Sequence, residues 1–255
     1  MLTPAKCRLC QLVKPLLNKS HIIPDFMYVS LFDEGHRLNK LSPVNFIKGN
    51  KHVSRPPSGE YEGSLLCAQC DNDIIGSYET YARKALYGDP NGNTDLPECA
   101  NFKTTDGIGF THCKNIHYKE FKLFLLSILW RASISSRPFF REVSLCPYEE
   151  EIIRQMILNG DPKDAETFPI LIITWLNDKS ASNDVVAQPG VNRQDKGIRY
   201  IFPIAGVTYI FHMSPISLDQ NLKGFILSAK NEVFLLHIPT GHSTGLLLTY
   251  FGAKV

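Results

Sequence analysis

Hydrophobic positions recur at helical spacing through much of the first two thirds of the chain, and in strand-like runs after it. The pattern predicts helices at 24–34, 71–88, 118–135 and 147–160. Proline or aspartate opens three of these segments and glycine closes two of them, as is typical of helix ends. Residues 42–64 and 89–111 are rich in turn-forming residues, so we expect them to be loops.

From residue 169 onward, β-branched and aromatic runs are separated by polar turns, which predicts strands. The five runs cover 169–176, 198–204, 207–214, 224–229 and 232–238. In one of them, Val207, Tyr209 and Phe211 share an apolar face, and His212 on the other face is expected to be exposed. The predicted class is therefore α+β. We expect a first domain at 1–95, a helical connecting region at 96–165 and a small β-rich C-terminal domain at 166–255.

The composition is that of a folded globular protein. The chain has 255 residues, of which 44% are hydrophobic and 20% are charged. The most apolar helical stretch, Phe121 to Trp130, is about half as long as a membrane span requires. The first residues lack the pattern of a secretory signal. We therefore expect a cytoplasmic protein with no membrane partner.

The net charge of +2 conceals an uneven distribution along the chain. Residues 1–57 contain nine Lys/Arg and three Asp/Glu, an excess of +6, whereas residues 58–100 contain two and eight. A local excess of this kind could face the phosphates of a nucleic acid. A solvated surface that is balanced elsewhere in the fold is an equally good interpretation.

Four of the seven cysteines form two CxxC pairs, which is the spacing of a metal clip. They are Cys7, Cys10, Cys67 and Cys70. Four thiolates suit a closed, tetrahedral structural zinc site. The 56 residues between the pairs cost roughly 3–4 kcal/mol to close into a loop, and a structural zinc contributes about 10–16 kcal/mol. Cys99, Cys113 and Cys146 follow no such pattern and are expected to have structural roles.

A histidine, His21, follows the first cysteine pair in the apolar run "SHIIP". Together with the CxxC before it and "LLCAQCD" at the start of a predicted helix, this run resembles the HNH, or ββα-metal, nuclease family. The resemblance covers residues 7–86 only. It implies that a strand hairpin presents the histidine, that zinc staples the ends and that the helix supplies a ligand for a second, catalytic ion.

On that resemblance, His21 would be the general base of a phosphodiester hydrolase, because an imidazole that titrates near neutrality can accept a proton from water. Asp71, directly after Cys70, would hold Mg²⁺ or another divalent ion. The alternatives from the residues themselves are a core histidine beside zinc and an aspartate that caps the helix. His112 and His117 have no matching ligand pair, so we expect structural roles for them.

The sequence departs from the family pattern in three ways. Ser20 stands where the family has an acidic residue, so it would support the site only as a weaker ligand. The asparagine that orients the histidine is not fixed by spacing; Asn45 is preferred over Asn50. The stretch from Pro24 to Cys67 is also longer than in the compact family core. Glu79 could reach the same face as Asp71, although a helix-surface acid is the simpler interpretation.

The expected activity is that of a metal-dependent endonuclease acting on nucleic acid, with DNA as the preferred expectation. By analogy alone, such a nuclease would belong to bacterial defence or DNA processing. The C-terminal domain would then select substrate, regulate the nuclease through a partner or form a homo-oligomer. The alternative is a non-catalytic zinc module that binds nucleic acid or protein, and Ser20 is the best argument for it.

Overall fold

A computed structural model describes residues 4–31, 40–41, 59–89, 96–178, 186–194, 197–214, 220–239 and 241–242. The chain divides into two compact units, and neither is continuous in sequence. Unit 1 comprises Met1–Phe26, Gly59–Leu96 and His117–Lys163, and unit 2 comprises Met27–Ser58, Pro97–Ile116 and Asp164–Val255. This division differs from the predicted boundaries at 95 and 165, because the region at 96–165 contributes to both units.

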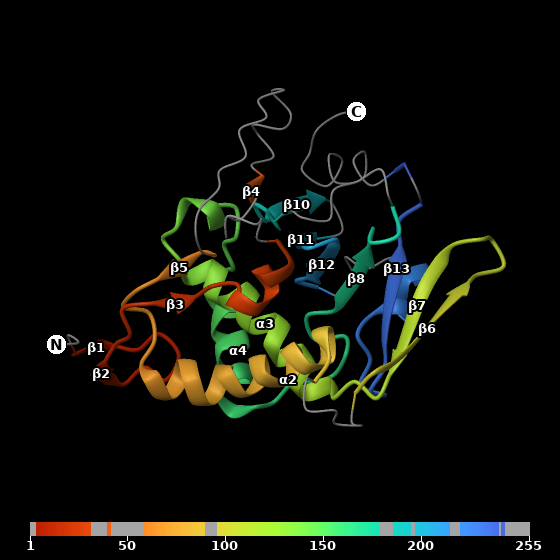
Figure 1. Cartoon of the computed structure of the whole chain (residues 1–255). Coiled ribbons are helices and arrows are strands. Elements are labelled where there is room, and N and C mark those ends of the chain that lie inside the picture. The colour runs from red at the N-terminus through yellow and green to blue at the C-terminus, as the bar shows by residue number, and fades with distance from the viewer. Residues whose placement is uncertain are drawn as a thin grey trace. The chain divides into compact units, whose positions relative to one another are not determined.

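Unit 1 contains three α-helices among its described residues, α2 (Gly76–Tyr87), α3 (Tyr118–Ile134) and α4 (Pro147–Asn159). Figure 1 shows them packed together, with α3 in contact with both others. Local signals explain their ends: α2 stops at Gly88, which has φ +84°, and α4 stops at the left-handed Gly160. Buried residues occupy nearly every side of α3, which explains its continuous apolar sequence.

Short strands lead into this helical bundle. A hairpin of β1 (Pro4–Lys6) and β2 (Val13–Pro15) carries the first cysteine pair in its turn. The chain then continues into β3 (Ser20–His21), which pairs antiparallel with β5 (Tyr61–Glu62). Hydrogen bonds extend this pairing in both directions, from the Leu16–Cys67 bridge to the bond between the Ile22 amide and the Glu60 carbonyl.

Two further helical segments follow β3 and β5. The predicted helix at 24–34 is a short 3₁₀ helix, η1 (Asp25–Leu31). Between β5 and α2 lies η2 (Gln69–Ile75), a π-helical segment in which the Gly76 amide donates to the Asp71 carbonyl, five residues back. The expectation that Asp71 caps the helix is wrong, because the helical path begins after Ala68 and Asp71 lies inside its first turn.

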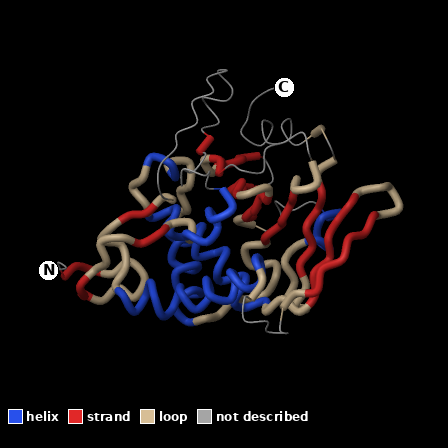
Figure 2. The backbone as a smooth tube through the Cα atoms, viewed as in Figure 1, coloured by secondary structure: helices blue, strands red, loops and turns tan. Residues whose placement is uncertain are grey.

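Unit 2 is built on a nine-stranded mixed sheet, with the strand order β4-β9-β11-β12-β8-β13-β7-β6 and β10 paired to β11. The strands are β4 (Lys40–Leu41), β6 (Glu98–Lys103), β7 (Gly109–Lys114), β8 (Ile170–Thr174), β9 (Val186–Ala187), β10 (Gly190–Gln194), β11 (Gly197–Ile204), β12 (Val207–His212) and β13 (Val233–His237). Figure 2 shows these strands in red. The mixed α and β class is thus confirmed, but the sheet is larger than the small C-terminal domain that was expected, because β4, β6 and β7 join it from earlier in the chain.

Three expectations for unit 2 are wrong. Residues 89–111 were expected to be loop, but they contain β6 and the start of β7, which pair as a hairpin. The run at 224–229 forms no regular strand, because its start belongs to η5 (Gln220–Phe225) and the rest makes only isolated bridges. His212 is buried, with 2% of its surface exposed, because both faces of β12 are covered.

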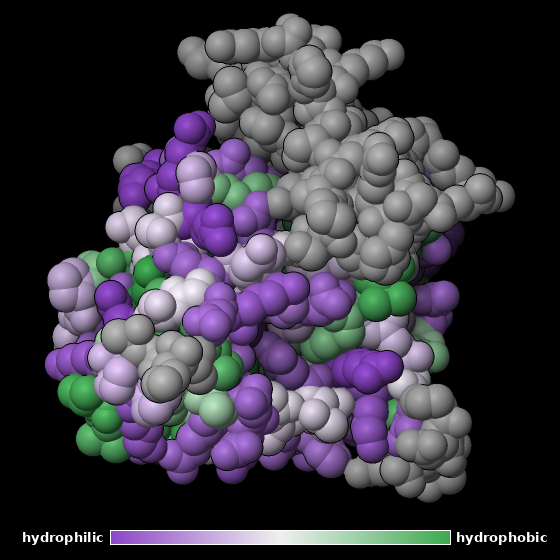
Figure 3. All heavy atoms as spheres, turned by 60° about the vertical axis from the view of Figure 1, so that its left-hand side comes forward, coloured by the Kyte–Doolittle hydropathy of each residue, from purple (hydrophilic) through white to green (hydrophobic). Residues whose placement is uncertain are grey.

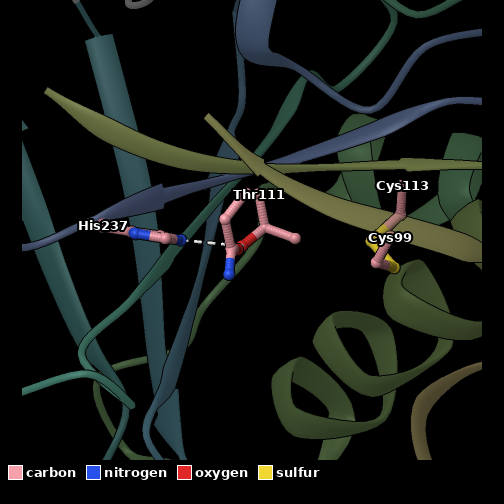
Figure 4. The surroundings of a disulfide bond; sticks show 5 residues. Cys99, Thr111, Cys113 and His237 are labelled. Carbon is pink, nitrogen blue, oxygen red and sulfur yellow. Dashed lines mark hydrogen bonds between the residues drawn. A yellow bond between two sulfur atoms is a disulfide. The ribbon is translucent and has the colours of Figure 1, made fainter. Parts of the chain in front are cut away.

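Cys99 and Cys113 form a disulfide across the β6–β7 hairpin, where their backbones lie directly opposite each other (Figure 4). The structural role expected for these two cysteines is therefore a covalent one. Figure 4 also shows His237 beside Thr111, with 2.7 Å between His237 Nε2 and Thr111 Oγ1. The hairpin is thus tied to its neighbour β13 by side chains as well as by the strand ladder.

Hydrophilic side chains cover much of the described surface seen in Figure 3, with hydrophobic residues scattered between them. Large exposed hydrophobic residues of unit 1 include Val13 and Tyr148, which are 72% and 75% exposed. Among the described helices, none combines the length and the apolar character needed to cross a membrane.

Candidate metal centre and histidine site

The four cysteines of the two CxxC pairs converge in unit 1. Their sulfur atoms all lie within 4.8 Å of one another. Cys7 and Cys10 come from the turn after β1, Cys67 lies just before η2, and Cys70 lies in the first turn of η2. Backbone hydrogen bonds join the two segments, since the Arg8 amide donates to the Leu65 carbonyl and the Cys67 amide lies 3.4 Å from Cys7 Sγ.

This arrangement fits a structural zinc ion. Tetrahedral Zn–S bonds place the sulfurs about 3.8 Å apart, so the cluster needs only a small contraction. Burial disfavours ionisation of the Cys7 thiol, but the amides of Cys67, Cys10 and Leu9 outweigh it and lower its pKa. Burial raises the pKa of Cys67 and Cys70. A metal would therefore displace protons from those two thiols as it binds.

His21 lies on β3, opposite Tyr61 of β5. Its side chain is 25% exposed, and its Nε2 is 3.6 Å from an oxygen of Asp25, four residues later in the chain. Burial lowers the pKa of His21. The positive charges of Lys19 and Arg131 lower this pKa further, and the carboxylates of Asp25 and Asp71 raise it but do not outweigh the lowering. The imidazole is therefore neutral at pH 7, which is the form that can accept a proton.

Asp71 lies inside η2, directly after the last cysteine. Burial raises the pKa of its carboxyl, against the effects of Arg131, the Ser20 hydroxyl and the His21 ring. The hydroxyl oxygen of Ser20 is buried, and no group in the described part of the chain forms a hydrogen bond of ordinary geometry with it. Ser20, His21 and Asp71 are thus close enough to influence one another, and buried polar atoms among them have unused bonding capacity.

Sequence reasoning missed Arg131, which joins α3 to this site. The side chain is 1% exposed, and its guanidinium donates to the His21 carbonyl and to Glu79 Oε1, at 2.7 Å each. It also donates to the carbonyl and hydroxyl of Ser127, one turn earlier in α3. Glu79 is consequently the partner of a buried arginine and not the surface acid that was the simpler expectation.

Asp25 is a second residue that sequence reasoning missed. It follows the "HIIP" run at the start of η1, and its carboxylate is 60% exposed beside the His21 ring. Its separation of only four residues from His21 was a usable signal, because a bend between the end of β3 and the start of η1 brings the two side chains together. No comparable signal existed for Arg131, since the contact with His21 spans 110 residues of sequence.

Other predicted positions fall outside this site. Asn45 and Asn50 lie outside the described residues, so the orienting asparagine stays a prediction. His112 stacks on Phe234, and His117 stacks on Tyr81. Cys146 is exposed, and its sulfur takes part in the capping box of α4. In the parts of the chain that the structure describes, the four cysteines are the one group of three or more His, Cys, Asp or Glu side chains that could hold a metal.

Comparison of the chain with models of protein families, with curated proteins and with solved structures gave no match. The chemistry of the site must therefore be argued from its own residues.

Proposed function

We propose that unit 1 is a metal-dependent endonuclease of the HNH type that hydrolyses phosphodiester bonds in DNA. The observation that carries the proposal is the position of His21, a neutral histidine on an antiparallel strand pair whose buried Nε2 has no hydrogen bond among the described residues. The strand pair is followed by the second cysteine pair and by η2, whose first turn contains Asp71. This order of elements supports the resemblance to the ββα-metal family.

In the proposed reaction, His21 accepts the proton of the water that attacks the phosphodiester, which is worth about 10²–10⁴ in rate. Arg131 fixes the backbone of His21 through the carbonyl, so the ring starts from a defined position. Asp71 would hold Mg²⁺ or another divalent ion, with Ser20 beside it. When bound, such an ion would stabilise the charge on the scissile phosphate and the leaving oxygen.

The test is nicking of supercoiled plasmid with added Mg²⁺, Mn²⁺ or Ni²⁺. We expect metal-dependent nicking by the wild-type chain, and its loss in His21→Ala and in Asp71→Ala. His117→Ala is the matched control, because it removes another histidine of unit 1 that stacks on Tyr81. Equal nicking by the wild type and by both site variants would assign the activity elsewhere and overturn the proposal.

The second candidate is a zinc-stabilised binding module without catalysis. It is favoured by Ser20 in place of an acid, and by the lack of a second group of three metal ligands in the described ranges. The two candidates differ in one readout. A folded, zinc-loaded wild type that binds DNA but never nicks it supports the module, whereas loss of nicking with retained binding in His21→Ala supports the nuclease.

The wider setting follows from the proposal and is equally a proposal. A cytoplasmic nuclease of this kind would suit defence against foreign DNA or DNA processing. Unit 2 would then select the substrate, form a homo-oligomer or respond to a partner.

A further inference from the structure

Two cations flank the tyrosine that pairs with His21. Lys19 Nζ lies 4.6 Å from the centre of the Tyr61 ring, and Arg137 Cζ lies 5.5 Å from it. The Tyr61 ring is 37% exposed and meets the His21 ring edge to face, at 6.2 Å between centres. These three residues, Lys19, Tyr61 and Arg137, are called the Tyr61 cluster below. They place two positive charges against the aromatic ring that meets His21.

Arg137 is held in place by the segment that follows α3. Its Nε donates to the Tyr61 carbonyl at 2.7 Å, and its amide donates to the Ser135 hydroxyl. A guanidinium has four further N–H donors, in a planar fork that matches the oxygens of a phosphate. The arginine is therefore oriented by one bond and retains donors suited to an anion.

The nearest carboxylate of the strand pair is engaged by other donors. Glu62 accepts hydrogen bonds from the Ser135 hydroxyl and from the amide and hydroxyl of Ser136, at 2.6 to 3.0 Å. Burial opposes ionisation of Glu62, but these donors, with a smaller contribution from the nearby charge of Arg137, outweigh it and lower its pKa. The serines thus stabilise the charge of Glu62, and its hydrogen bonds do not use the two cations of the Tyr61 cluster.

Arg131 shows the contrast between a structural cation and a binding one in the same unit. It also lies next to His21, but it is 1% exposed and donates to Glu79, Ser127 and the His21 carbonyl. Lys19 is exposed, and its ammonium rests against an aromatic face. A ligand can reach the Tyr61 cluster, whereas the guanidinium of Arg131 is shielded from it.

We propose that the Tyr61 cluster binds a backbone phosphate of DNA, next to the phosphodiester whose hydrolysis His21 assists as general base. This inference rests on the proposed function and narrows it, because it selects Lys19 from the nine basic residues of 1–57 and adds Arg137 from outside that segment. Phosphate contacts fix the register of a nucleic acid without reading its sequence. The cluster would therefore position the strand for cleavage at many sequences.

The experiment measures binding of labelled duplex DNA as a function of salt, in the non-cleaving His21→Ala background. Loss of one phosphate contact should make the slope of log K against log salt shallower by about 0.9. We expect that change, with a several-fold weaker affinity, for added Lys19→Gln. Arg137→Gln should change the slope similarly, but it also removes the bond to the Tyr61 carbonyl, so Lys19→Gln is the decisive variant.

Lys119→Gln is the matched control. It removes the same charge from the first turn of α3, about 18 Å along the helix from Arg131. Equal slopes for Lys19→Gln and Lys119→Gln would overturn the inference, even if the wild type nicks DNA. A slope that changes only with Lys19→Gln supports the inference. If the wild type then fails to nick, the phosphate site stands and the nuclease falls.

Discussion

The two units use cysteine in opposite ways. In unit 1, four free thiols from turns about sixty positions apart gather within 4.8 Å, while the strands around them are only two or three residues long. In unit 2, Cys99 and Cys113 face each other in a hairpin that is already part of a nine-stranded sheet. Unit 1 thus gathers four thiols that could hold an organising metal, whereas the disulfide of unit 2 reinforces a structure that strand pairing already defines.

The same contrast appears in two histidines whose pKa is lowered by burial, His21 in unit 1 and His237 in unit 2. His237 belongs to a continuous chain of polar contacts, from Asn177 through His237 and Thr111 to Asn101. His21 has a buried Nε2 with no hydrogen bond in the described part of the chain. A lowered pKa is therefore not enough to indicate catalysis. Unused bonding capacity separates His21 from His237, and the position beside Ser20 and Asp71 separates it from His112, whose buried Nε2 also has no hydrogen bond among the described residues.

The largest effect should come from removing a ligand of the metal centre. We expect Cys67→Ser to lose zinc and to unfold unit 1, because structural zinc contributes about 10–16 kcal/mol to folding. Metal analysis and thermal unfolding by circular dichroism measure both changes. Cys146→Ser is the control, since serine can replace the sulfur as the cap of α4. Retained zinc and an unchanged melting temperature in Cys67→Ser would refute the clip.

The next largest effect should come from Arg131→Met, which leaves Glu79 without its partner. Breaking a buried ion pair from one side costs about 3–5 kcal/mol, and here the His21 carbonyl also loses a donor. Chemical denaturation should show a smaller loss for the double variant Arg131→Met with Glu79→Leu than for Arg131→Met alone. Equal losses would mean that the pair is not coupled. Arg141→Met, in an exposed pair with Glu142, should cost little.

Local signals in the sequence were sufficient for much of unit 1. Helices α2, α3 and α4 lie where apolar spacing, proline and glycine predicted them, and the CxxC spacing identified the cysteine cluster. These features depend on neighbours a few residues apart. The need for glycine at position 63 was not predicted in the same way. The backbone of Asn18 approaches so closely that a Cβ at Gly63 would lie 2.6 Å from the Asn18 carbonyl oxygen.

The predictions that failed concern residues whose structural partners are distant in sequence. The β6–β7 hairpin is polar and rich in turn formers, and it becomes part of a sheet because β13 pairs with β7. His212 was expected on a solvated face, but β12 is covered on both sides. Arg131 is a charged residue in an otherwise apolar helix, and its contact with His21 could not be predicted because the two lie 110 residues apart. The histidine site was thus partly predictable, and the residues that support it were not.

A smaller effect is expected from the disulfide. Replacing both Cys99 and Cys113 by alanine should lower the free energy of unfolding of unit 2 by about 3 kcal/mol, the loop-closure value for a separation of 14 residues. Zinc content should not change, which separates this variant from Cys67→Ser. Differential scanning calorimetry, with and without a reductant for the wild type, makes the measurement. Loss of zinc in this variant would contradict the independence of the two cysteine systems.

The smallest effect, and the sharpest test of the two histidines, is a pair of opposite pKa shifts. Asp25 raises the pKa of His21 and Lys19 lowers it, against a net lowering by burial. Asp25→Asn should therefore lower that pKa further, and Lys19→Gln should raise it, with His237 unchanged in both. NMR titration of the ring protons follows each histidine separately.

The lowered pKa of His21 determines how both the stability of unit 1 and the rate of nicking depend on pH. A His21 whose folded pKa is below 6.5 binds fewer protons in the folded state, so unit 1 loses stability as the pH falls below that value. The neutral base persists to a lower pH than an ordinary histidine allows, so the acidic limb of the nicking profile should lie below pH 6.5. Asp25→Asn should move that limb to lower pH and Lys19→Gln to higher pH. Removing a negative and a positive neighbour should shift the pKa of His21 in opposite directions. If both variants moved the acidic limb the same way, the charges around His21 would not be those of the structure.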